Sequence, residues 1–588
     1  CNALGVASKP LPDELAPAST TFCNPLDLPY KFQVGFPPTP GQIPYREAAD
    51  PSMVVFKDMY FLFVSKSGGY WYSKDMASWT LVVPTGLPLE DYAPTAMVMD
   101  NKIFWTASNS QAIFATDDPI QGNWYKVADV GLHWDPFLFQ DDDKKFYFAW
   151  GCNFNSPITM MELDPTDNWK LVGGPVECLR GNQSLYGWES SKFSFTQSLQ
   201  SAAVKLAVGD TPFIEGAWMN KVGGRYYLQY AGPGTELDAY GDGVYVSDVS
   251  PMGPYRRDPH SPVSHKPTGF IPGAGHGSTF QDLKGQWWHI ATGVVSVRHN
   301  FERRLMLLPA YFDPEKFPAH FLHGNQTTAP SFLTDTLQGD FPTRLDQTKP
   351  GWQLLSLFKE VTVSSTLSSS YRAYYAVDEN IKTWWSAMTG DSGEWLSVDL
   401  GSLVTAYAVQ INFADQDAIE QGRLQDAYRY YVEVSADGSS WSALADLDRR
   451  ENTRDSSQDY VELRKAVKLR HFRVTSVCVP GGARFSISGL RIFGLGGGKP
   501  PEAVSMIAAY GREQDRRKAR VTWAAAKGAQ YYVVRWGLRG GPLFQNLQVY
   551  GAFSVDMDAL SVNEAYTFVV DSVNEAGLTR GVGTADID

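Results

Sequence analysis

One hydrophobic pattern recurs in the first half of the chain. A short apolar strand leads into a polar turn of Asp, Asn, Lys or Gly, and a second strand rich in aromatic residues follows. Two apolar segments around such a turn predict a β-hairpin. The five copies begin at Met53, Ala96, Pro136, Ala217 and Ser278.

The spacing of these hairpins predicts a β-propeller. The first three copies start 43 and 40 residues apart, and repeats of this length are typical of small sheets that stack around an axis. We therefore predict five blades within residues 31–340. The step to the fourth copy is 81 residues, and the extra length, from Cys178 to Gln200, is predicted to be a loop insertion near the site.

The pattern changes after residue 340. Residues 353–496 alternate apolar and polar side chains between polar turns, as in Tyr431-Val-Glu-Val-Ser and Ile487-Ser-Gly-Leu-Arg-Ile-Phe. A Gly-Gly-Gly-Lys-Pro-Pro linker at 496–501 then leads into residues 502–588, which show the same strand pattern. Alternation of this kind predicts antiparallel strands, so we predict an all-β protein.

Composition and charge exclude several classes of protein. The 588 residues carry a net charge of −13, and without a basic stripe we expect no nucleic-acid partner. The sequence contains no apolar run of 18 residues, so no membrane span is predicted. The five cysteines contain no Cys-x-x-Cys pair, so neither a disulfide framework nor a zinc site is predicted. Cys152 and Cys178 are either a disulfide pair or two small buried thiols.

The first residues suggest where the protein resides. The chain begins Cys1-Asn and continues through a stretch rich in Pro, Ala and Ser to about residue 28. This resembles a bacterial lipoprotein after signal-peptide removal, with the lipid on Cys1 and a tether over residues 1–30. We expect anchoring at the bacterial cell surface or in the periplasm, or secretion otherwise, with membrane contact only through the anchor.

Three acidic residues precede the repeated hairpins. Asp50 and Asp135 each stand before proline, and Glu215 stands before glycine. Each alone has an ordinary explanation, because Asp-Pro begins turns. In a propeller, however, the ends of the innermost strands converge on one face. Three acids at equivalent blade positions, each near an aromatic residue, therefore predict one pocket.

At these residues the first half resembles glycoside hydrolase family 43, a family with a five-bladed propeller and three catalytic acids. The resemblance covers residues from about 40 to 315. It is carried by Ala49-Asp-Pro-Ser-Met, Tyr92-Ala-Pro-Thr, Trp134-Asp-Pro-Phe-Leu-Phe, Ile214-Glu-Gly-Ala-Trp, Tyr226-Tyr-Leu-Gln-Tyr-Ala-Gly-Pro-Gly-Thr-Glu and Gly275-His-Gly-Ser-Thr-Phe. It implies that Asp50 is the general base, that Glu215 is the general acid, and that Asp135 orients Glu215 and raises its pKa.

These roles agree with the chemistry of inverting hydrolysis. One carboxylate activates a water and one carboxylic acid protonates the leaving oxygen, across a gap of roughly 6.5–9.5 Å. A third carboxylate nearby disfavours ionisation of the acid by like-charge repulsion.

Further residues are assigned to the pocket. The resemblance places His276 at the propeller axis, bound to a hydrated calcium ion or to water, and the alternative is a buried histidine satisfied by backbone groups. Arg298 is chosen as a donor to the sugar from a segment with three arginines. Trp71 and Trp134 are chosen as walls on which a sugar ring stacks, although most propeller tryptophans pack between blades. We expect no organic cofactor.

The two C-terminal segments also resemble known modules. Residues 353–496 resemble a coagulation factor 5/8 type C, or discoidin, domain, a jelly-roll sandwich that often binds carbohydrate and often holds calcium near a segment like Asp378 to Thr383. Glycan binding and a purely architectural role both stay open. Residues 502–588 are similar to a fibronectin type III domain, with a core Trp523 and with Leu560 followed by Tyr566 as in a tyrosine corner. We expect this last domain to be a spacer.

These features predict a monomeric, inverting, exo-acting glycoside hydrolase with a carbohydrate substrate. A deep pocket formed by the insertion from Gly151 to Thr211 would favour removal of a terminal furanose or pentose from polysaccharide-derived glycans. An α-L-arabinofuranosidase or β-D-xylosidase is the first expectation, and a β-D-galactofuranosidase of the same fold is the alternative. A non-catalytic glycan-binding propeller is the alternative class, and the presence of all three acids favours the enzyme.

Overall fold

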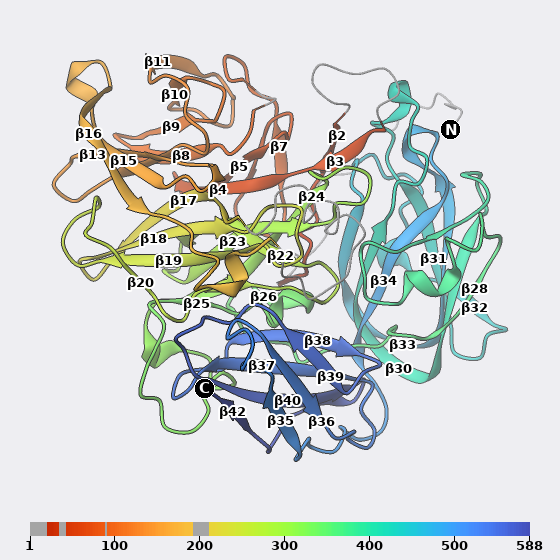
Figure 1. Ribbon diagram of the computed structural model, residues 1–588. Coiled ribbons are helices and arrows are strands. Elements are labelled where there is room, and N and C mark those ends of the chain that lie inside the picture. The colour runs from red at the N-terminus through yellow and green to blue at the C-terminus, as the bar shows by residue number, and fades with distance from the viewer. Residues whose placement is uncertain (1–19, 34–42, 89–90, 192–210) are drawn as a thin grey trace. The chain divides into compact units, whose positions relative to one another are not determined.

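The computed structural model describes residues 20–33, 43–88, 91–191 and 211–588 (Figure 1). Cys1 lies outside these residues. Strands dominate, which confirms the all-β class. The helices in the described ranges are short 3-10 turns, and none is long and apolar enough to span a membrane. They are η1 (Pro165–Asp167), η2 (Gly187–Glu189), η3 (Pro314–Lys316), η4 (Gln338–Asp340), η5 (Ala373–Ala376), η6 (Gln421–Arg423), η7 (Ala445–Leu447) and η8 (Pro480–Gly482).

The chain divides into two compact units. One contains residues 45–74, 79–340 and 499–588. The other contains residues 341–498, residues 75–78 and the described residues before 45.

The first unit opens with five antiparallel sheets in chain order, after the short strand β3 (Tyr45–Glu47). The first and second sheets are β4 (Ala49–Phe56), β5 (Met59–Ser65), β6 (Tyr70–Ser73), β7 (Thr80–Val82) and β8 (Thr95–Met99), β9 (Lys102–Thr106), β10 (Ala112–Thr116), β11 (Tyr125–Asp129). The third is β12 (Phe137–Gln140), β13 (Phe146–Trp150), β15 (Ile158–Asp164), β16 (Lys170–Leu179). The fourth is β14 (Asn153–Phe154), β17 (Phe213–Val222), β18 (Arg225–Gly232), β19 (Gly241–Ser247), β20 (Arg256–Arg257) with β21 (Ser264–His265). The fifth is β22 (Gly273–Gln281), β23 (Trp287–Val294), β24 (Arg303–Tyr311), β25 (Leu333–Thr334).

These sheets contain the predicted hairpins. The pairs β4–β5, β8–β9, β12–β13, β17–β18 and β22–β23 are all antiparallel. The first strands contact one another in turn, from β4 to β8, β12, β17 and β22, and β22 contacts β4 again. A closed series of this kind places the beginnings of the five first strands around one channel. Aromatic side chains fill the space between sheets, as where Phe63 and Tyr70 pack with Trp105 and Trp124.

The last part of the first unit is a two-sheet sandwich. One sheet is β35 (Ile507–Tyr510), β36 (Ala519–Trp523), β39 (Ser554–Met557), and the other is β38 (Gln545–Tyr550), β37 (Tyr531–Leu538), β40 (Tyr566–Asn574), β41 (Gly577–Thr579) with β42 (Ala585–Ile587) beside β40. Trp523 packs in the core. The Tyr566 hydroxyl accepts a hydrogen bond from the Ser561 amide at 2.8 Å, which is the kind of contact a tyrosine corner makes.

This C-terminal sandwich docks on the sheets before it, so its description as a spacer is wrong. Asn546 Nδ2 donates to Thr336 Oγ1 at 2.9 Å, and an Arg535 guanidinium nitrogen donates to the His320 carbonyl at 3.0 Å. Polar side chains on β37 and β38 thus face hydrogen-bonding partners on the first part of the unit. A spacer would leave these groups to water.

The first part of the predicted insertion, which runs from Gly151 to Thr211, is not a loop. Its beginning is ordinary sheet, because β15 and β16 occupy residues 158–179. The described segment that follows binds the C-terminal sandwich, since the Gly187 amide donates to the Leu560 carbonyl at 3.0 Å and the Val562 amide to the Leu185 carbonyl at 2.8 Å. Residues 192–210 lie outside the described residues, so the predicted deep pocket stays a prediction.

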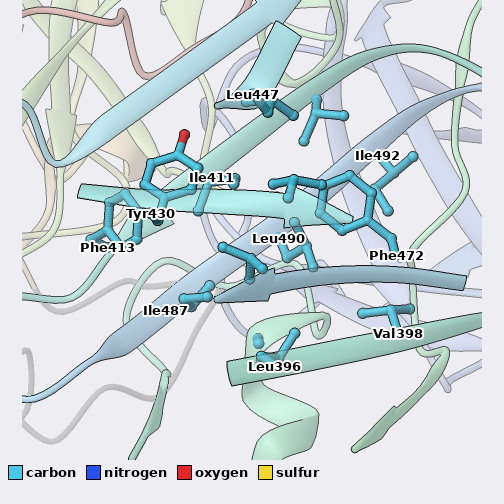
Figure 2. Packing of buried hydrophobic residues seen from close by; sticks show 14 of the residues in the cluster. Leu396, Val398, Ile411, Phe413, Tyr430, Leu447, Phe472, Ile487, Leu490 and Ile492 are labelled. Atoms are coloured by element: carbon cyan, nitrogen blue, oxygen red, sulfur yellow. The ribbon is translucent and has the colours of Figure 1, made fainter. Parts of the chain in front are cut away.

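The second unit is built on one antiparallel sheet of eight strands. They are β27 (Gln353–Leu354), β34 (Ser486–Leu495), β30 (Trp395–Phe413), β33 (Gln458–Cys478), β31 (Arg429–Ser435), β32 (Trp441–Ala443), with β28 (Glu360–Val363) beside β30 and β29 (Trp385–Ser386) beside β34. Alternate residues of the long strands, such as Leu396, Val398 and Ile411, are fully buried and pack against Phe472 and Ile492 (Figure 2). The period-2 pattern of the sequence therefore defines this core.

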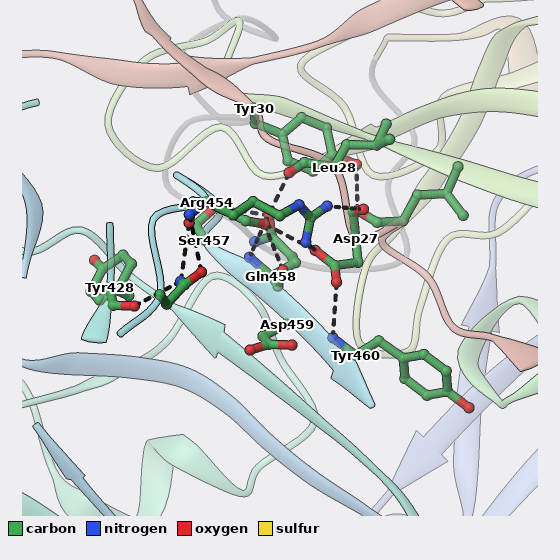
Figure 3. A network of polar contacts seen from close by, with 12 residues as sticks. Asp27, Leu28, Tyr30, Tyr428, Arg454, Ser457, Gln458, Asp459 and Tyr460 are labelled. Atoms are coloured by element: carbon green, nitrogen blue, oxygen red, sulfur yellow. Dashed lines mark hydrogen bonds and ion pairs between the residues drawn. The ribbon is translucent and has the colours of Figure 1, made fainter. Parts of the chain in front are cut away.

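Residues 20–30 are fixed to this second unit. The Arg454 guanidinium donates to the Asp27 carboxylate at 2.6 Å, and the Tyr460 amide donates to it at 3.4 Å (Figure 3). Leu28 is fully buried. Two short strands, β1 (Thr21–Phe22) and β26 (Thr343–Arg344), pair here, and β2 (Lys31–Gln33) follows. The predicted tether over residues 1–30 is therefore wrong for residues 20–30, because a paired carboxylate and buried apolar side chains hold them.

Candidate active site

The five propeller sheets begin with the same backbone feature. Two residues before the regular hairpin pairing starts, the backbone is left-handed, with φ between 43° and 66°. This position is occupied by Asp50, Ala93, Asp135, Gly216 and His276. Such backbone is costly for residues other than glycine and is found preferentially at functional sites. Its recurrence marks one shared turn at each blade entrance.

Glu215 occupies a different place in this register. It stands one residue before the shared position, which in the fourth sheet is Gly216. The expectation of equivalent positions is therefore right for Asp50 and Asp135 and wrong for Glu215. The reason is crowding, because a Cβ atom at Gly216 would lie 2.7 Å from the His276 ring.

His276 and Cys152 connect the three acids. His276 Nδ1 lies 3.3 Å from Asp50 Oδ1 and 3.7 Å from Asp135 Oδ2. Ligand atoms of Asp135, Glu215 and Cys152 all lie within 4.8 Å of one another. The structure thus brings together the acids of the first, third and fourth sheets and the histidine of the fifth.

Asp50 is buried among hydrogen-bond donors. Ser65 Oγ donates to its Oδ2 at 2.6 Å, and Arg303 donates to its Oδ1 at 3.1 Å. Burial by itself raises the pKa of Asp50, but the charges of Arg303 and His276 and the hydrogen bond from Ser65 outweigh it and hold the pKa below its ordinary value. Asp50 is therefore ionised and can accept a proton.

Arg303 was not among the predicted residues. At the start of β24, its side chain is almost fully buried and joins Asp50 to Glu47, whose Oε1 lies 2.5 Å away. The sequence offered one signal, since an arginine that opens a strongly apolar strand needs a carboxylate partner. The residue that the sequence analysis predicts is Arg298. Its amide nitrogen donates to Glu302 at 2.8 Å, and its contact with a sugar stays a prediction.

Glu215 is buried among neutral donors. The Tyr240 hydroxyl donates to its Oε1 at 2.5 Å and the Cys152 thiol donates to its Oε2 at 3.4 Å. Burial raises the pKa of Glu215, and the Asp50 charge raises it further, while His276 and the two hydrogen bonds oppose this. The net pKa lies above the ordinary value, so Glu215 retains its proton to higher pH than a free carboxyl group.

Asp135 is the third buried carboxyl group. Its amide donates to Ser108 Oγ at 3.1 Å. Burial raises the pKa of Asp135 to about 7, with the charges of Glu215 and Asp50 adding to the effect and His276 opposing it. The charge of Glu215 raises the pKa of Asp135 in addition to burial, whereas the pKa of Glu215 is raised by its own burial and by Asp50. The role of Asp135 in raising the pKa of Glu215 stays a prediction.

Comparison with known families identifies two domains in the chain. Residues 43–318 match the model of Glycosyl hydrolases family 43. These residues form a family 43 glycoside hydrolase domain. Residues 360–486 match the F5/8 type C domain, so the second unit contains a discoidin domain. No curated protein matches the chain.

Several solved structures are similar to the chain. An endo-1,4-beta-xylanase from Bacteroides thetaiotaomicron is 20% identical, with a TM-score of 0.37, over 46% of this chain and 93% of the other. An exo-1,5-alpha-L-arabinanase from a bovine ruminal metagenomic library is 21% identical, with a TM-score of 0.34, over 47% and 96%. The GH43 protein BlXynB from Bacillus licheniformis is 14% identical, with a TM-score of 0.39, over 95% and 90%.

The hydrated calcium ion, or water, predicted at His276 of the hydrolase domain stays a prediction, although a calcium site held by protein side chains does not fit here. Calcium takes six to eight oxygen ligands, whereas His276 offers imidazole nitrogens, and its Nδ1 faces Asp50 and Asp135. Burial lowers the pKa of His276, but four neighbouring acidic residues outweigh it and raise the pKa above the ordinary value. The ring therefore faces the acids and keeps its second proton to higher pH than a free imidazole.

The two predicted aromatic walls differ in burial. Trp134, next to Asp135, is 46% exposed, whereas Trp71 is 0% exposed. Trp71 lies inside β6, where it pairs with Leu62 and Leu81. A fully buried ring offers no face to a sugar, so the assignment of Trp71 is corrected. The role of Trp134 stays a prediction.

The calcium predicted for the discoidin domain is assigned to the segment from Asp378 to Thr383. The Asp378 carboxylate accepts hydrogen bonds from Thr383 Oγ1 at 2.7 Å and from the Asn380 amide at 3.2 Å. Burial raises the pKa of Asp378 to about 7, against these hydrogen bonds. Asp378 is only partly buried and offers calcium one oxygen donor, so the calcium of the discoidin domain stays a prediction.

Proposed function

We propose that the hydrolase domain cleaves glycosidic bonds with inversion of the anomeric configuration. The observation that supports this is the opposite perturbation of two neighbouring carboxyl groups. The pKa of Asp50 lies below its ordinary value, because Arg303 and His276 outweigh its burial, and the pKa of Glu215 lies above, chiefly because it is buried. Paired carboxyl groups whose surroundings separate their pKa values are the arrangement for a base and an acid.

In the proposed reaction each proton has a defined origin. Glu215 transfers its proton to the glycosidic oxygen as the bond to the anomeric carbon breaks. Asp50 removes a proton from a water that attacks the opposite face of that carbon. Asp135 and Tyr240 position Glu215, and Arg303 and Ser65 hold Asp50 in its ionised form.

For the substrate we propose a terminal furanose or pentose, with α-L-arabinofuranosides or β-D-xylosides first and β-D-galactofuranosides second. The support is the resemblance of the acid-bearing segments to family 43. Nitrophenyl glycosides of arabinofuranose, xylopyranose and galactofuranose test the choice by initial rates. Calorimetric binding of oligosaccharides without any turnover would favour the non-catalytic alternative.

The remaining architecture is part of the proposal. We infer that the five sheets are five blades of one propeller, supported by the closed series of contacts between their first strands. The C-terminal sandwich is proposed as a fibronectin type III domain, supported by Trp523 and by the Ser561–Tyr566 contact. Glycan binding by the discoidin domain is tested with the same oligosaccharides and a variant of the full chain inactivated at Glu215.

A further inference from the structure

A thiol lies beside the general acid. Cys152 follows β13 and is partly exposed, and its Sγ lies 3.4 Å from Glu215 Oε2. With one carboxylate oxygen each from Asp135 and Glu215, it forms a group of three atoms within 4.8 Å of one another. Hydrolysis of a glycoside uses no sulfur, so the proposed function gives this thiol no chemistry of its own.

One carboxylate oxygen of Asp135 has no hydrogen-bond donor. Asp135 Oδ2 is buried and accepts no hydrogen bond from any described residue, and Asp135 as a whole is 6% exposed. The nearest cationic atom is His276 Nδ1, at 3.7 Å. A buried carboxylate oxygen without a donor costs free energy, which a bound cation would recover.

We propose that Asp135, Cys152 and Glu215 bind a thiophilic divalent cation, such as Zn²⁺ or Cd²⁺, and that this cation blocks hydrolysis. Zinc sites with three protein ligands and one open position are common. Bonds of about 2.3 Å to sulfur and about 2.0–2.2 Å to oxygen at a tetrahedral angle separate the two ligand atoms by roughly 3.6 Å. The Cys152–Glu215 separation of 3.4 Å is close to this value.

The ligand set also selects among cations. Calcium and magnesium take oxygen ligands, whereas thiolate sulfur favours softer ions. On binding, metal–sulfur and metal–oxygen bonds form, and the protons of the Cys152 thiol and of the Glu215 carboxyl group leave to solvent. The inhibition rests on the proposed function, because a cation on Glu215 removes the proton that the leaving oxygen needs. The binding itself does not depend on that role.

Cadmium binding to the chelator-stripped full chain tests the site without an activity assay. The ultraviolet band of a cadmium–thiolate bond should appear on titration of the wild type. Cys152→Ser should lose the band, and its cadmium affinity should fall about tenfold or more. Cys178→Ser is the matched control, because Cys178 is a free buried thiol whose Sγ lies near the Val176 carbonyl, and it should titrate as the wild type does.

The outcomes separate the binding site from the proposed function. No cadmium band in the wild type, an equal band in Cys152→Ser, or equal competition by calcium would overturn the site. Cys152→Ala, checked for folding by circular dichroism, repeats the test without a hydroxyl group. Zinc should inhibit the wild-type enzyme, and a chelator should restore the rate. Cadmium bound through Cys152 with undiminished hydrolysis would overturn the inhibition and the role of Glu215 as the acid.

Discussion

Asp50 and Glu215 are buried to a similar extent, but the groups that surround them differ in charge. Both residues are buried, at 5% and 8% exposure. Asp50 accepts a hydrogen bond from the Arg303 guanidinium, whereas Glu215 accepts from the neutral Tyr240 and Cys152. The pKa of Asp50 is lowered below its ordinary value and that of Glu215 is raised above it. At equal burial, the charge of the partner therefore determines which carboxyl group keeps its proton.

Removing either ionisable group should have the largest effect. Glu215→Gln and Asp50→Asn should each lower kcat by about 10² to 10⁴, the range for loss of one acid or base. Initial rates on an unactivated glycoside measure this. Asp117→Asn, a change at an exposed acid of the same domain, is the control and should keep the wild-type rate. More than about half of the wild-type kcat in either active-site variant contradicts its assignment.

Removing the Arg303 guanidinium should make the environment of Asp50 similar to that of Glu215. In Arg303→Met the pKa of Asp50 rises, because burial is no longer outweighed, and the acidic limb of the kcat/KM profile moves up by about 1–3 pH units. Arg303→Lys keeps the charge and should shift the limb less. Since Arg303 is a buried ion-pair partner, thermal unfolding must show that both variants are folded. An unmoved acidic limb in folded Arg303→Met would show that Arg303 does not control the base.

Asp135→Asn should change the other limb. Glu215 must be protonated to act, so activity is lost as pH rises through its pKa. Without the negative charge of Asp135, Glu215 ionises at lower pH and the alkaline limb of the profile moves down. The profile should be recorded with a chelator present, so that bound metal does not contribute. An alkaline limb in the wild-type position would remove this role from Asp135.

Tyr240→Phe should give the smallest shift, with the opposite sign. The Tyr240 hydroxyl stabilises the ionised form of Glu215, so its loss raises the pKa of Glu215 and moves the alkaline limb to higher pH, by less than about one unit. The same pH–rate profile measures it. A downward shift would mean that Tyr240 acts on Glu215 by some route other than this hydrogen bond.

Local pattern was sufficient to predict the strands and the shared register position of two of the three predicted acids. The hairpins are encoded by short apolar runs around polar turns, and Asp50 and Asp135 repeat one Asp-Pro turn at two blade entrances. Local pattern could not predict that Glu215 lies one residue before the shared position. It depends on the clearance between Gly216 and the His276 ring, which belong to different sheets.

The partners of the acids depend on contacts between distant segments. Ser65 reaches Asp50 because β4 and β5 pair with Ala49 opposite Ser65, and Arg303 reaches it from the fifth sheet. Neither contact leaves a motif around Asp50. Trp71 shows the opposite error, in which closeness in sequence is mistaken for closeness to the site. It lies within 25 residues of Asp50, but its ring is buried inside its own blade.

The anomeric configuration of the first product tests the central claim most directly. If Asp50 activates a water and Glu215 protonates the leaving oxygen, the product has the configuration opposite to that of the substrate. Proton NMR of a fast-cleaved glycoside, recorded before mutarotation, distinguishes the two anomers. We predict inversion. Retention, or a glycosyl-enzyme trapped on Asp50, would contradict the assignment of the base.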